Sequence, residues 1–231
     1  MSTVFSGKRW SIQRFISGFA NNGFLITCLR TGKSVIVDTP AHPDELVAAA
    51  SATQVEAILI THGHSDHLEG FAAVTDVFGA PVGIGTADRE MLPASAKRVS
   101  EYLDISTNRL IEVGDIALRP MATPGHTPGS TCFVLGLSPR PEAGAPGSGE
   151  SASHVFTGDT LFPGGPGRSA SPDALRQMLD SINGHIYVLL DSTVILPGHG
   201  EFTTIGDSKR EYAVFAARPI AATLSGDVTW A

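Results

Sequence analysis

Thr61-His62-Gly63-His64-Ser65-Asp66-His67 follows directly on the apolar run Ala57-Ile58-Leu59-Ile60. That run is short and contains β-branched residues, which is typical of a buried strand. The glycine and the serine of the quoted stretch are small, so we expect a loop at the end of this strand. On an extended backbone His62 and His64 point to the same side, whereas the adjacent Asp-His pair points in two directions. The loop can therefore serve two metal ions, with one pair of side chains for each.

The crowding of histidines in this loop favours a metal centre. Three of the eight histidines of the chain, together with one carboxylate, lie within six positions. Crowded imidazoles repel one another when protonated and lose hydration when neutral, so ordinary packing does not account for them. Imidazole and carboxylate donors without cysteine suit Zn, Fe or Mn, and spacing alone does not choose among these metals.

The same local pattern recurs three more times: a short predicted strand ends, a turn with glycine follows, and a histidine or an aspartate lies in the turn. The residues concerned are His126, Asp159 and His199. Each of them, considered alone, could be a solvent-exposed or turn residue. Ligands of α/β proteins usually bind where strand ends gather at one edge of a sheet, so we expect these three side chains to join the first cluster.

Predicted strands and helices alternate along the whole chain, which indicates the α/β class. Asp66 is expected to cap a short helix that runs to Val74, and residues 94–108 are predicted to be loop. Residues 1–231 are expected to form a single domain. A segment rich in proline, glycine, alanine and serine, at about 138–153, is predicted to be a flexible surface loop.

The composition argues against several classes of function. A net charge of −7 is unfavourable for nucleic-acid binding, which needs clustered lysine and arginine. No apolar run approaches the length of a membrane span, and residues 1–10 lack the apolar stretch of a signal peptide, so we expect no membrane partner and a cytoplasmic protein. Cys28 and Cys132 lie in apolar, strand-like segments and are expected to be buried thiols.

Taken in order, these motifs resemble those of the metallo-β-lactamase superfamily over roughly residues 23–206. The matching motifs are His62-x-His64-x-Asp66-His67, Gly125-His126, Gly158-Asp159 and Pro197-Gly198-His199-Gly200. The resemblance implies a four-layer αββα sandwich with the metals at one edge. It also implies two sets of metal ligands with one bridging carboxylate: His62, His64 and His126 for one ion, Asp66, His67 and His199 for the second, and Asp159 between them.

Within the superfamily, the segments around His126, Asp159 and His199 are most similar to glyoxalase II-type thioester hydrolases. This resemblance implies two divalent ions, zinc in first place with iron or manganese as alternatives, and a small-molecule acyl substrate. Such ions lower the pKa of water from about 15.7 towards ~7, so that a hydroxide bridging them can cleave a thioester or ester. Asp66 and Asp159 would be the catalytic carboxylates. The chain ends soon after His199, so we expect it to lack the helical C-terminal domain that helps glyoxalase II hold glutathione.

A second interpretation, from another class of enzyme, is a mononuclear iron persulfide dioxygenase. The resemblance allows it on the same fold, and the Gly167-Arg168 pair after Asp159 also occurs in that branch. This oxidoreductase would use His62, His64, His126 and Asp159 only. Hydrolysis of β-lactams is less favoured, because of the bridging aspartate and the expected compartment.

Three further residues are candidates for supporting roles. Arg168, after a glycine-rich turn, could bind a substrate carboxylate, against the alternative of a plain surface arginine. Thr61 and Glu69 flank the first cluster and could orient the metal ligands, against the alternative of ordinary packing or exposure.

Overall fold

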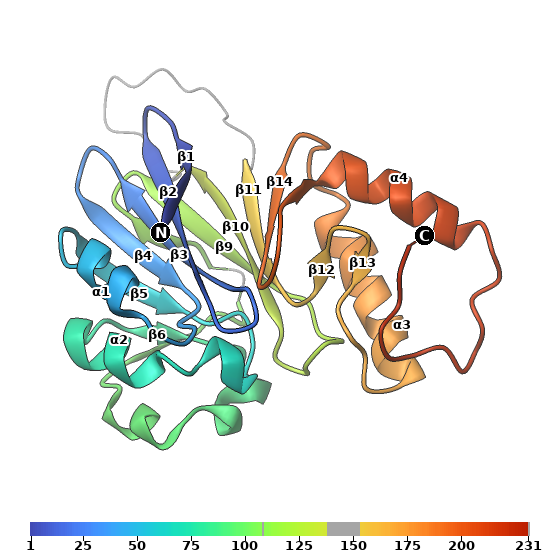
Figure 1. Cartoon of the computed structure of the whole chain (residues 1–231), viewed down its shortest axis with the longest axis horizontal. Coiled ribbons are helices and arrows are strands. Elements are labelled where there is room, and N and C mark those ends of the chain that lie inside the picture. Colours follow the sequence, from blue (N-terminus) through green and yellow to red (C-terminus); the bar gives the residue numbers. More distant parts are fainter. Residues whose placement is uncertain (108, 138–152, 231) are drawn as a thin grey trace.

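The computed structural model describes residues 1–107, 109–137 and 153–230, so nearly all of the predicted loop at 138–153 lies outside the described residues. Two sheets face each other in the middle of the molecule (Figure 1). The first sheet has the strand order β1 (Ser2–Ser6), β2 (Trp10–Ser17), β3 (Asn21–Cys28), β4 (Lys33–Val37), β5 (Gln54–Leu59), β6 (Val82–Gly83) and β7 (Tyr102–Leu103). The second has the order β15 (Thr203–Thr204), β14 (Val194–Pro197), β11 (His154–Gly158), β10 (Thr131–Leu137), β9 (Ile116–Ala122) and β8 (Ile111–Val113). A small third sheet pairs β12 (Leu161–Phe162) with β13 (Gly165–Pro166).

Strand β3 illustrates why the central strands are apolar on both faces. Successive side chains of a strand point to opposite sides. Phe24 and Ile26 therefore belong to the core between the two sheets, whereas Leu25 packs on the outer side of the first sheet. Because neither face meets water there, the central residues 23–26 form a continuous apolar run rather than an alternating one.

Four α-helices in the described ranges cover the outer faces of the sheets (Figure 1). They are α1 (Asp44–Ala50) and α2 (Phe71–Phe78) on the first sheet, and α3 (Pro172–Ser181) and α4 (Ile205–Ala216) on the second. Leu46 and Phe71 are buried against the first sheet, and Leu175 and Ile205 against the second. Burying a side chain of this kind stabilises the fold by about 1.5–3 kcal/mol. One core lies between the two sheets, one between the first sheet and its helices, and one between the second sheet and its helices. These three cores confirm the predicted αββα sandwich.

Two local predictions were wrong. Asp66 does not cap a helix: it lies in a single 3₁₀ turn, Ser65–His67, and α2 begins after Gly70 without a side-chain cap. The Asp66 carboxylate contacts His199 instead. Residues 94–108 are not all loop, because Ala94–Arg98 forms a 3₁₀ helix and β7 pairs in parallel with β6. A two-residue edge strand is defined by its partner, and its own sequence carries no pattern.

The residues after His199 complete the second half of the sandwich. They form β15 and α4, and the chain then returns so that the Trp230 backbone N–H donates to the Gly164 carbonyl over 2.7 Å. The Trp230 ring is buried against Tyr212 and Phe215 of α4. None of the helices in the described ranges is long and apolar enough to cross a membrane. Both cysteines are buried free thiols, as predicted.

His154, at the start of β11, is a buried histidine outside the predicted metal cluster. Its ring lies edge-on to Phe5, with 4.7 Å between ring centroids, and its Nδ1 bonds the Ser153 hydroxyl over 2.8 Å. Burial lowers the pKa of His154 from 6.5 to about 4. The unfolded chain therefore takes up this proton near pH 6.5, whereas the folded chain does so only near pH 4. Acidification between these values favours unfolding.

We expect this buried imidazole to make the fold measurably sensitive to acid. Between about pH 7.5 and about pH 5, the wild-type free energy of unfolding should fall by roughly 2 kcal/mol more than that of His154→Leu. Urea denaturation of chelator-treated protein at the two pH values measures the difference. Parallel losses in the two proteins would show that His154 is protonated in the folded state.

Candidate metal centre

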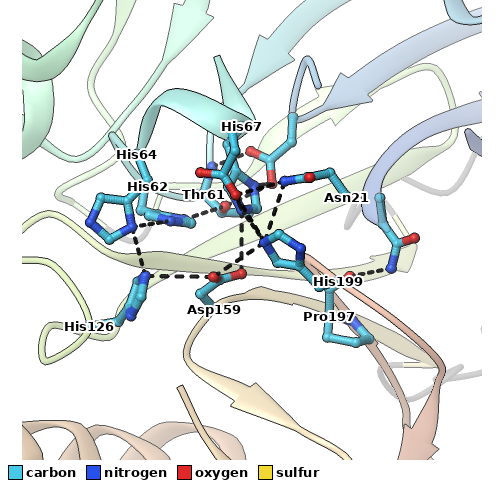
Figure 2. Close-up of polar contacts among 12 residues, drawn as sticks. Asn21, Thr61, His62, His64, His67, His126, Asp159, Pro197 and His199 are labelled. Carbon is cyan, nitrogen blue, oxygen red and sulfur yellow. Dashed lines mark hydrogen bonds and ion pairs between the residues drawn. The ribbon is translucent and has the colours of Figure 1, made fainter. Parts of the chain in front are cut away.

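The seven predicted ligands converge at one edge of the two sheets, where four strands end (Figure 2). The His62-to-His67 loop follows β5, His126 follows β9, Asp159 follows β11 and His199 follows β14. Parallel β11 and β14 are neighbours in the second sheet, which brings Asp159 and His199 together. The sandwich places the β5 loop of the first sheet opposite them.

The first ligand group consists of His62, His64 and His126. His64 Nδ1 lies 3.1 Å from His62 Nε2 and 2.9 Å from His126 Nε2. Two nitrogens that bind zinc tetrahedrally at about 2.0–2.1 Å are about 3.3 Å apart. The observed separations are close to this value, so the three nitrogens face a common position.

The second ligand group consists of Asp66, His67 and His199. His199 Nε2 lies 3.2 Å from His67 Nε2 and 3.1 Å from Asp66 Oδ2. Asp159 lies between the two groups: its Oδ2 is 3.6 Å from His126 Nε2 and 3.5 Å from His199 Nε2, and its Oδ1 is 3.4 Å from His67 Nε2. One carboxylate can thus reach ions held by either group.

The outer nitrogens of these histidines make hydrogen bonds that orient the rings. His67 Nδ1 bonds Asp38 Oδ2 over 2.9 Å, His126 Nδ1 bonds the Arg168 carbonyl over 2.9 Å, and His199 Nδ1 bonds the Phe19 carbonyl over 3.1 Å. A carbonyl or carboxylate oxygen only accepts, so in each ring Nδ1 carries the proton. Nε2 is then the atom that faces the centre, as a metal ligand requires.

The charges around the centre favour a cation. Burial and the neighbouring imidazoles lower the pKa of His62 well below its ordinary value. Burial also acts to lower the pKa of His67, but the charges and hydrogen bonds of Asp38 and Asp159 outweigh it and raise this pKa to about 10. The two carboxylates therefore stabilise a positive charge at this place, among closely spaced nitrogens. In the metal-free chain that charge is the additional proton on His67.

One buried oxygen shows that the residues fit a metal ion. Among the described residues, no hydrogen bond of regular geometry reaches the buried Asp159 Oδ1, which has His67 Nε2 at 3.4 Å. A buried carboxylate oxygen without a partner is costly, and an ion is one explanation for it. Imidazole nitrogens and carboxylate oxygens are the donors that Zn, Fe and Mn accept in proteins. The donor set, its spacing and the position of this oxygen are consistent with the two-ion prediction.

Two glycines allow the strand-end loops to approach closely. A Cβ on Gly198 would lie 2.4 Å from Asp159 Oδ1 and 2.5 Å from His67 Cε1. Gly158 has φ +49°, and a Cβ there would lie 2.5 Å from Thr61 Oγ1. A side chain at either position would push the ligands apart, so the Gly-Asp and Gly-His motifs are explained by space as well as by turn geometry.

Two buried carboxylates support the centre but were not predicted from the sequence. Asp38 accepts from the backbone N–H and the hydroxyl of Thr61, both over 2.8 Å, in addition to its bond with His67. Asp88 accepts from the Gly63 and Gly129 backbone N–H groups over 2.9 and 2.7 Å. It thereby ties the His62-to-His67 loop to the loop that carries His126. The only sequence signal for Asp38 was its place directly after a strand.

The supporting candidates have different outcomes. The Thr61 hydroxyl lies 3.1 Å from His62 Nδ1, so Thr61 helps to orient one of the predicted ligands. Glu69 is exposed. The side chain of Arg168 is also exposed, and the contact that the structure gives this residue is through its backbone carbonyl to His126.

Relatives of the chain include both uncharacterized and named proteins. An uncharacterized protein of Mycobacterium tuberculosis is 36% identical over 172 residues, which cover 67% of this chain and 73% of that protein. The probable hydroxyacylglutathione hydrolase glo2 of Schizosaccharomyces pombe is 31% identical, over 80% of this chain and 66% of its own length. Hydroxyacylglutathione hydrolase GloC of Haemophilus influenzae is 27% identical, over 77% of this chain and 84% of its own length.

Solved structures with the same fold include a metallo-beta-lactamase from Staphylococcus aureus, with a TM-score of 0.71 and 24% identity over 88% of this chain and 63% of that one. ETHE1 from Myxococcus xanthus has a TM-score of 0.69 and 24% identity, over 90% of this chain and 85% of its own. A family model described as the metallo-beta-lactamase superfamily matches residues 16–139, more than half of the chain. With these motifs, this fold and this match, the chain belongs to the metallo-β-lactamase superfamily.

Proposed function

We propose that this protein is a metal-dependent hydrolase of small thioesters or esters that works with two divalent ions, zinc in first place. The observation that carries the proposal is the position of Asp159, whose carboxylate lies between the two ligand groups, within 3.4–3.6 Å of His67, His126 and His199. Two relatives of moderate identity are named hydroxyacylglutathione hydrolases, which supports a thioester as substrate.

The ligand groups are buried on one side and open on the other. The side chains of His62 and His67 are 1% exposed, whereas those of His199 and Asp66 are 24% and 33% exposed. When bound at such a site, divalent ions make water acidic enough to attack at neutral pH and stabilise negative charge on a carbonyl oxygen. This exposed side is where a substrate could approach, as a catalytic rather than a structural site requires.

Asp159, Asp66 and Arg168 have separate roles in the proposed site. Asp159, which is 14% exposed, lies between the two groups. The hydrogen bond with His199 lowers the pKa of Asp66 well below its ordinary value, so this side chain stays a carboxylate that can bind the second ion. The proposal requires no serine or cysteine nucleophile, in keeping with the buried positions of both cysteines. The side chain of Arg168 is exposed, and the backbone carbonyl of this residue contacts His126. We propose that the guanidinium binds a carboxylate of the substrate.

Metal analysis combined with a substrate panel tests the proposal. We expect protein purified without added metal to contain about two zinc ions per chain and to hydrolyse thioesters or esters. Removal of the metal should abolish this activity, and zinc should restore it. The panel includes thioesters, esters, lactones and glutathione persulfide. One iron per chain, with oxygen uptake on the persulfide, would contradict the proposal and favour the dioxygenase interpretation.

A further inference from the structure

The segment that joins β2 to β3, made of the turn at 18–20 and of Asn21 and Asn22 at the start of β3, lies against the second ligand group (Figure 2). The backbone carbonyl of Phe19 accepts from His199 Nδ1 over 3.1 Å. The side chain of Asn21 donates from Nδ2 to Asp66 Oδ2 over 2.8 Å, and the same Nδ2 lies 3.3 Å from His199 Nε2. Two of the three ligands in this group are therefore contacted by a turn that carries no ligand itself.

The orientation of the Asn21 amide is determined by its partners. Its Oδ1 accepts from the Phe19 backbone N–H over 3.2 Å, and only an oxygen can do so. The NH₂ group must then face the Asp66 carboxylate, which only accepts. The side chain is 2% exposed, so water competes little for these bonds. The amide holds the carboxylate in place without neutralising it, whereas a lysine or arginine there would pair with the charge that an ion needs.

Buried contacts hold the turn in place against the loop that carries His199. Arg14 is 7% exposed and donates to Asn22 Oδ1 over 2.7 Å and to the Gly200 carbonyl over 2.6 Å. Asn22 donates in turn to the carbonyls of Pro197 and Gly200. Ala20 has φ +60°, a conformation that costs a non-glycine residue free energy and persists only where the surroundings impose it. The turn is therefore built into the fold.

The first ligand group is oriented by other segments. His126 is held by the Arg168 carbonyl, and His62 lies against the Thr61 hydroxyl. A change in the Asn21 side chain should therefore act on one ligand group and leave the other intact.

We propose that Asn21 is a positioning residue that sets the affinity of the second ligand group for its ion independently of the first group. The inference rests on the proposed two-ion function. Partners that orient metal ligands typically change metal affinity by 10- to 100-fold, because a ligand that can rotate away binds more weakly.

Zinc titration of metal-free protein against a chromophoric chelator tests the inference. We expect wild-type protein to bind two ions, and Asn21→Ala to bind one of them about 10- to 100-fold more weakly and the other within about threefold of wild type. Asn21→Leu, which roughly keeps the side-chain volume but lacks the amide, should weaken the binding of the same ion to a similar extent. Ile16→Ala is the matched control, because that side chain lies on β2 near the turn, is 54% exposed and belongs to neither ligand group.

His126→Ala identifies the affected site, since it removes a ligand from the first group only. In this background the remaining zinc ion should be bound about 10- to 100-fold more weakly when Asn21→Ala is added. Equal weakening of both ions by Asn21→Ala, or no weakening, would overturn the inference while leaving the two-ion function in place. A wild-type protein that binds a single ion would overturn both.

Discussion

Replacing His64 by alanine is expected to lower kcat/KM by at least about 10³-fold, because a bound metal ion contributes several kcal/mol of transition-state stabilisation. His64 is the centre of the first ligand group, with its Nδ1 3.1 Å from His62 Nε2 and 2.9 Å from His126 Nε2. It is half-exposed and is not among the buried residues of the three cores. The loss of activity should therefore come without a loss of fold.

The measurement is steady-state hydrolysis of the best thioester or ester of the panel, with metal content and circular dichroism on the same samples. His185→Ala is the matched control, since His185 is exposed and lies outside the ligand groups. We expect it to keep wild-type turnover and metal content. Near-normal turnover of His64→Ala would show that the first ligand group does not carry the chemistry.

Replacing Asp38 by asparagine is expected to lower the free energy of unfolding by about 3 kcal/mol and the metal affinity about 10- to 100-fold. The Asp38 carboxylate is 2% exposed and accepts three hydrogen bonds, two from Thr61 and one from His67. In asparagine an NH₂ group replaces one of the two oxygens and would face the N–H and O–H donors of Thr61 and His67. At least one of these donors would then lack an acceptor. Asp38 has φ +59°, which asparagine tolerates, so the substitution isolates the lost acceptor from backbone strain.

Urea denaturation and zinc titration of this variant measure the two effects. Asp44→Asn is the control, because Asp44 is exposed at the start of α1 and should change the stability by no more than about 1 kcal/mol. If Asp38→Asn unfolds at the wild-type urea concentration, the hydrogen bonds to Asp38 do not contribute to stability in the way that their burial indicates.

The predicted ligands could be recognised from sequence because each one stands out locally. A histidine or an aspartate directly after an apolar strand, in a turn with glycine, is visible without any knowledge of the fold, and the four loops meet where those strands end. The strands themselves were predictable for a similar reason, since β3, β5 and β10 each contain a run of apolar residues. β7 and the 3₁₀ turn at Asp66 were not, because their conformation depends on partners distant in the sequence.

The sequence by itself determined which side chains can bind metal and that they follow strands of an α/β protein. Only the tertiary structure decided how they are held: Asp38 on His67, Asp88 between two loops, the Phe19 and Arg168 carbonyls on His199 and His126, and Asn21 on Asp66. The physical reason is that a backbone carbonyl is the same in every residue, and a buried aspartate or asparagine acquires its role from neighbours that the packing of two sheets brings to it.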